Sequence, residues 1–128
     1  MASNNRIFIA FAVEDKWARE YLVGQARNDK SPFEFINMSV NEPWDERWKT
    51  QCRSRIRGCD GMIALVSKNT KSASGALWEI KTAKEEQVPV RGVYTTVDDR
   101  PATLPSELSG VRVVAWTWDN IKAFLDIL

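Results

Sequence analysis

Residues 61–80 have the sequence GMIALVSKNTKSASGALWEI. The first six, GMIALV, form an apolar run typical of a β-strand that is buried on both faces. The polar residues 67–75 predict a loop, and residues 76–87 predict a helix that Pro89 ends. A buried strand that leads through a polar loop into a helix indicates an α/β domain with a parallel sheet.

The same alternation continues on both sides of this segment. Further strands are predicted at residues 6–11, 33–37, 90–94 and 111–115. Helices are predicted at about residues 15–25, from Pro43 to Gly58, and after Thr117, which is expected to cap the last one. Helices join the first four strands, and a long loop at residues 95–109 is predicted before the fifth. This pattern predicts a flavodoxin-like, three-layer fold with a five-stranded parallel sheet of strand order 2-1-3-4-5.

Length and composition indicate one domain spanning residues 1–128. The 128 residues are 44% hydrophobic and include six tryptophans, which is enough for a single core. The formal net charge of +1 does not favour a nucleic-acid or anionic-membrane binder. The start of the chain lacks a secretory signal pattern, and no apolar run approaches the roughly 20 residues that span a bilayer. A soluble, cytoplasmic protein is therefore expected.

The chain contains no histidine. This excludes Ser-His-Asp and Cys-His catalysis and histidine-based zinc sites. Cys52 and Cys59 lie seven residues apart, without the CxxC spacing of a metal site, and are predicted to be buried free thiols. Any acid, base or cation-stabilising chemistry would therefore fall to a carboxylate.

Glu79 is the leading candidate for that carboxylate. In open α/β sheets, ligands bind beyond the carboxyl ends of the strands, where the first and third strands diverge. Residues 11–15 and 67–75 are expected to form this crevice. At 100° per residue, Glu79 lies at the edge of the helix's apolar face, beside Ala83, and near the helix start, where the macrodipole favours an anion. An ordinary acidic residue at a helix start is the simpler interpretation of the pattern alone.

Other residues near the crevice have both ligand-binding and structural interpretations. Phe11 suits stacking on a planar ring, although a strand's last buried residue has the same pattern. The donor-rich loop 67–75 suits ribose or phosphate, but it lacks the established glycine-rich phosphate motifs. Trp78 suits packing, a lid or an oligomer contact. Glu14 and Asp15 resemble the paired acids of receiver domains, but the third strand ends in Val66-Ser67 rather than in the aspartate that receivers phosphorylate.

Several motifs together resemble the TIR-like family that includes the ThsB proteins of bacterial Thoeris anti-phage systems. They are RIFIAF near the start, the LVSKNT to WEI segment, VPVRGVY after it, and LVGQARNDKSPFEFINMS, which looks like the family's first helix and second strand. The resemblance covers roughly residues 6–94. It implies a flavodoxin-like fold and an enzyme that cleaves the bond between nicotinamide and ribose in NAD with a glutamate that matches Glu79.

The resemblance further implies that the ADP-ribose is cyclised or conjugated into a signal that activates a separate effector protein. NAD would be the substrate, with no cofactor and no metal, and assembly into a homo-oligomer is compatible with it. Besides Glu79 as the catalytic residue, the predicted substrate contacts are Phe11, Ala12, Ser39, Ser67, Asn69 and Trp78.

Two other functions remain open. One is a non-catalytic TIR-like module that acts through protein–protein surfaces. The other is an enzyme like the nucleoside deoxyribosyltransferases, which also place a glutamate on a flavodoxin-like sheet.

Overall fold

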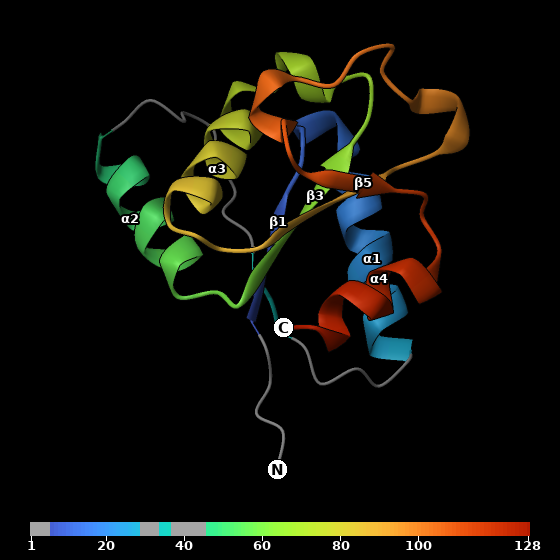
Figure 1. Cartoon of the computed structure of the whole chain (residues 1–128), viewed down its shortest axis with the longest axis horizontal. Helices are drawn as coiled ribbons and strands as arrows, with labels where there is room; N and C mark the ends of the chain where they lie inside the picture. The colour runs from blue at the N-terminus through green and yellow to red at the C-terminus, as the bar shows by residue number, and fades with distance from the viewer. Residues whose placement is uncertain (1–5, 29–33, 37–45) are drawn as a thin grey trace.

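The computed structural model describes residues 6–28, 34–36 and 46–128 (Figure 1). The strands are β1 (Arg6–Ala10), β2 (Glu34–Ile36), β3 (Gly61–Val66), β4 (Val90–Tyr94) and β5 (Arg112–Val114). The α-helices are α1 (Lys16–Asn28), α2 (Glu46–Arg57), α3 (Ser74–Glu85) and α4 (Trp118–Asp126). Short 3-10 turns occupy Val13–Asp15, Thr70–Ser72, Val97–Asp99 and Ser106–Leu108.

The strands pair in parallel in the order β2-β1-β3-β4-β5. The central strands β1, β3 and β4 are the longest, and three-residue strands form the two edges. Ile9 lies beside Ile63, and Ala64 lies beside Gly92. The direction in which successive strands add to the sheet reverses between β1 and β3, so their carboxyl ends open the crevice expected of this flavodoxin-like class.

Helices cover both faces of the sheet. In Figure 1, α2 and α3 lie on one side, and α1 and α4 lie on the other. Alternate residues of β1 divide between two buried clusters, with Phe8 facing α2 and α3 and Ile9 facing α1 and α4. Every residue of β3 is buried, which is the reason for its continuous apolar sequence.

The helix after β3 differs from its predicted bounds. It begins at Ser74 rather than at residue 76, and it ends at Glu85. Gln87, predicted to be helical, has a left-handed φ of 59°, a conformation that turns the chain out of a helix. The Val88 amide then donates to the Ala83 carbonyl at 2.8 Å. Local geometry therefore ends α3 before Pro89 is reached.

Other boundaries follow the sequence more closely. Thr117 caps α4, because its side-chain oxygen accepts a hydrogen bond from the Asn120 amide. The predicted loop at residues 95–109 contains two 3-10 turns, and its Leu108 side chain is buried. The predicted start of the second helix at Pro43 lies outside the described residues. Among the residues described, no helix has the length and apolar character that a membrane span requires.

Candidate functional site

Glu79 is buried in the second turn of α3, with 5% of its surface exposed. The expectation that it lies at the edge of the apolar face, near the helix start, is therefore only partly right. Helix α2 packs against α3, and Cys52 of α2 lies against Glu79. Burial by a neighbouring helix depends on tertiary packing, so the pattern within α3 could not reveal it.

Burial changes the protonation of Glu79. Removal from water raises the pKa of its carboxyl from 4.5 to about 8, although a hydrogen bond from Cys52 acts in the opposite direction. That bond joins the Cys52 Sγ to Glu79 Oε2 over 3.7 Å. Burial, followed by the proximity of Glu79, also raises the pKa of the Cys52 thiol. Both groups therefore favour their neutral forms at neutral pH.

Among the residues that the structure describes, no basic side chain offsets this burial. Within the described ranges, no lysine or arginine lies within ion-pair distance of Glu79. An isolated buried carboxyl is costly to ionise, and an approaching cation would lower that cost. Such a carboxyl is thus suited to a positively charged ligand or transition state.

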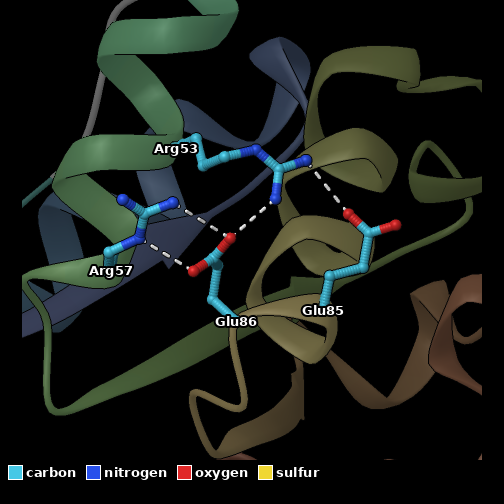
Figure 2. A network of polar contacts seen from close by, with 4 residues as sticks. All are labelled: Arg53, Arg57, Glu85 and Glu86. Atoms are coloured by element: carbon cyan, nitrogen blue, oxygen red, sulfur yellow. Dashed lines mark hydrogen bonds and ion pairs between the residues drawn. The ribbon is translucent and has the colours of Figure 1, made fainter.

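An ion-pair network holds α2 against the carboxyl-terminal end of α3 (Figure 2). Arg53 bridges Glu85 and Glu86 at 3.0 and 2.8 Å, and Arg57 Nε contacts Glu86 Oε1 at 2.8 Å. Hydrogen bonds from Arg57 and then Arg53 hold the pKa of Glu86 at about 2. The network joins the surfaces of the two helices that carry Cys52 and Glu79, and Glu86 is its centre, because both arginines contact it.

Trp78 belongs to the same helix pair. Its ring centroid lies 5.2 Å from that of Trp48, with the planes tilted by 50°. The Arg53 guanidinium lies 5.8 Å from the Trp78 ring centroid. These contacts show that Trp78 packs between α2 and α3. Its contact with a substrate stays a prediction.

At the switch point, three polar side chains form a network around Asp15. The Ser67 hydroxyl donates to Asp15 Oδ2 at 2.5 Å, and the Asn69 side-chain amide donates to Asp15 Oδ1 at 3.2 Å. The Asn69 backbone amide donates to the Ser67 oxygen at 3.0 Å. Asp15 thus ties the loop after β1 to the loop after β3, and no described hydrogen bond links this network to Glu79.

This network changes the interpretation of two residues. Ser67 has no exposed surface, so in this structure its hydroxyl positions the loop, and its contact with a substrate stays a prediction. The sequence placed Asp15 in the crevice loop 11–15 and, with Glu14, in a pair like the acids of receiver domains, but it indicated no partner for either. The partners of Asp15 lie 52 and 54 residues away in the chain, and no local sequence signal indicates contacts of that range.

The remaining predicted contacts differ in accessibility. Asn69 is partly exposed, and Phe11 is partly buried against the cluster beneath α1 and α4. Ala12 is only 1% exposed, and its carbonyl accepts a hydrogen bond from the Asp15 amide. Ser39 lies outside the described residues. Phe11 and Asn69 are therefore the predicted contacts that the crevice loops leave accessible. Glu79 lies apart from them, on the side of the sheet that α2 and α3 cover.

Residues 8–100 match the family model described as "Thoeris protein ThsB, TIR-like domain". The matched range runs from β1 past β4 and includes Glu79 and the Asp15 network. A search of curated proteins finds no match.

Several solved structures share the fold. A Clostridium botulinum CMP N-glycosidase, BcmB, aligns with a TM-score of 0.60 at 15% identity, covering 96% of this chain and 99% of that one. The TIR domain of the Toll-related receptor TRR-2 from Hydra magnipapillata aligns with a TM-score of 0.59 at 16% identity, covering 91% and 88%. A prokaryotic SEFIR domain aligns with a TM-score of 0.54 at 14% identity, covering 97% and 90%.

Proposed function

Because the chain belongs to the ThsB TIR-like domain family of the Thoeris systems, we propose that it cleaves the bond between nicotinamide and ribose in NAD. Glu79 is the catalytic carboxylate in this proposal. The observation that carries it is the position of Glu79: 5% exposed, on the helix after β3, and without a basic partner among the described residues. A carboxyl in this state interacts most strongly with a ligand that brings its own positive charge.

NAD supplies that charge. The nicotinamide nitrogen is cationic while bound to ribose, and it takes the bonding electron pair when the bond to the anomeric carbon breaks. The ribose then acquires oxocarbenium character. An ionised Glu79 would stabilise this charge, as an electrostatically preorganised group does. Because nicotinamide leaves as a neutral molecule, no general acid is needed, and a chain without histidine can perform the step.

The acceptor at the anomeric carbon determines the product. Water would give ADP-ribose, whereas a nucleophile of the same or another molecule would give a cyclic or conjugated ADP-ribose. Following the family resemblance, the proposal includes such a nucleotide as a diffusible signal to a separate effector protein in the cytoplasm. Assembly of several copies is also part of the proposal, as a condition for activity.

Mass spectrometry of NAD-derived products tests the proposal. Lysates of phage-infected cells that express the wild-type chain, Glu79→Gln or Glu85→Gln are incubated with NAD. Glu85 is a matched control, because it is a carboxylate on the exposed side of the same helix. We expect nicotinamide and an ADP-ribose product with the wild-type chain and Glu85→Gln, and neither with Glu79→Gln.

Two results would reject the proposal. Equal nicotinamide release by Glu79→Gln would remove Glu79 from catalysis. No release by any of the three proteins, with phage defence retained, would instead favour a non-catalytic interaction module.

The pH profile gives a second readout for Glu79. Since burial raises the pKa of its carboxyl to about 8, kcat/KM for NAD should rise with pH up to about that value as the free enzyme ionises. A profile that is flat between pH 6 and 8 would contradict an ionised Glu79 as the stabilising group.

Hydrolysis of another N-glycosidic bond is a second candidate. The similarity to a CMP N-glycosidase covers 96% of this chain, and loss of a base from a nucleotide also passes through positive charge at the anomeric carbon. Adding CMP, and separately a nucleoside with a free base, to the same assay distinguishes the candidates. Release of cytosine without nicotinamide would favour the glycosidase, and base exchange would favour the deoxyribosyltransferase class.

A further inference from the structure

A cavity of about 430 Å³ opens at the carboxyl ends of β4 and β5, beside α1 and the start of α4. This volume is within the range of small-molecule sites, roughly 300–1,000 Å³. None of the residues predicted to contact NAD lines it. It lies beyond the carboxyl ends of these strands and away from the β1–β3 switch point.

Aromatic rings form much of the cavity wall. Trp17 and Tyr21 of α1 are 50% and 59% exposed, although large aromatic side chains are usually more buried. Tyr21 meets Trp116 edge to face, with ring centroids 5.8 Å apart and an interplanar angle of 71°. The Trp116 indole donates to Gln25 Oε1 at 2.8 Å, which holds that ring in place. A preformed set of exposed rings suits a flat, aromatic ligand.

Thr95 adds a polar group to the cavity wall. It is 5% exposed and lines the cavity, but among the described residues its hydroxyl has no hydrogen bond. Leaving a buried hydroxyl unpaired is costly. Because a hydroxyl can both donate and accept, the nitrogen-rich edge of a nucleobase would satisfy it.

Arg100 provides a positive charge at the same cavity. Its guanidinium carbon lies 4.4 Å from the ring centroid of Tyr94, and the side chain is exposed. In the described ranges, no carboxylate lies within ion-pair distance of Arg100. An arginine held in this way is suited to phosphate.

We propose that this cavity binds a nucleotide at a site separate from Glu79. The base lies against the rings of Trp17, Tyr21 and Trp116, with its edge at the Thr95 hydroxyl, and the phosphate lies at Arg100. This assignment does not depend on NAD cleavage, because binding requires no reaction at the glycosidic bond.

Isothermal titration calorimetry of the full chain with AMP tests the site. Ribose 5-phosphate, which has the phosphate but no base, is the ligand control. We expect saturable binding of AMP that is much tighter than that of ribose 5-phosphate. Trp17→Ala should weaken AMP binding about 5- to 150-fold, which corresponds to the loss of one base-stacking contact. Arg27→Ala, an exposed change elsewhere on α1, should bind AMP as the wild type does.

Thr95→Val separates ligand binding from folding. It removes an unpaired hydroxyl at almost constant volume, so the midpoint of urea unfolding should not fall, while AMP affinity should fall roughly 2- to 10-fold. Glu79→Gln should bind AMP with unchanged affinity. The proposal is overturned if AMP does not bind, if ribose 5-phosphate binds equally well, or if Trp17→Ala and Thr95→Val bind AMP like the wild type. It is also overturned if Glu79→Gln alone abolishes binding.

Discussion

Replacing Glu79 by glutamine should change the pH dependence of stability in a calculable way. The folded protein keeps a proton on Glu79 up to pH about 8, whereas the ordinary pKa of this carboxyl is 4.5. Between these values the native state binds a proton that the unfolded state has released. The contribution of Glu79 to the stability of the folded protein is therefore fully present below pH 4.5 and is lost as the pH rises through about 8.

The size of the effect follows from this window. Between pH 4.5 and about 8, each pH unit lowers the free energy of unfolding by about 1.4 kcal/mol. The total over this range is about 5 kcal/mol. Glutamine has nearly the same shape but does not ionise, so the variant lacks this loss. Relative to the wild type, Glu79→Gln should therefore gain roughly 4 kcal/mol between pH 5 and pH 8.

Urea unfolding followed by tryptophan fluorescence at pH 5, 6, 7 and 8 measures this difference. Other carboxylates titrate in both proteins and cancel in the comparison. Glu85→Gln controls for the loss of one negative charge from the same helix. The reasoning is refuted if the difference between Glu79→Gln and wild type is constant from pH 5 to 8, or if it has the same pH dependence as the control.

Three further predictions concern the elements that position the sites. Asp15→Ala should lower the free energy of unfolding by about 1.5–3 kcal/mol, because it leaves the buried Ser67 hydroxyl without its charged acceptor; urea unfolding measures this, and an unchanged midpoint would contradict it. Gly92→Ala should cost about 1–3 kcal/mol, because the added Cβ would lie 2.7 Å from Val113 Cγ2. Calorimetry should show recovery in the double variant with Val113→Ala, and no recovery would exclude this clash as the cause. Glu86, whose pKa is held at about 2, should remain ionised in a carbon-detected NMR titration until the pH approaches that value, with its stabilising contribution lost as the pH falls from 4.5 through 2; a midpoint near 4.5 would disprove the network in solution.

The sequence predicted the α/β class because its elements depend on local patterns, and the strand order because crossover rules leave few arrangements for a parallel sheet. GMIALV is apolar throughout since β3 is covered on both faces, and a parallel neighbour requires the helix that follows it. The two cysteines were likewise predicted to be buried free thiols, and this is confirmed. The motifs also identified the family, since LVSKNT and WEI both lie within the matched residues 8–100.

Sequence patterns did not predict the environment of the candidate site. Sequence periodicity placed Glu79 at the edge of its helix, but only the packing of α2 buries it against Cys52 and raises its pKa. The sequence pattern predicted a substrate contact for Ser67, whereas in the fold its hydroxyl donates to Asp15.

The sequence by itself determined the elements, their order and the presence of a carboxyl on the helix after β3, because each is encoded by neighbouring residues. Tertiary structure alone decided which of these groups lose water and which residues they meet. Desolvation and hydrogen bonding depend on segments distant in the chain, so the protonation of Glu79 and the aromatic cavity containing Thr95 appear only after the helices have packed on the sheet.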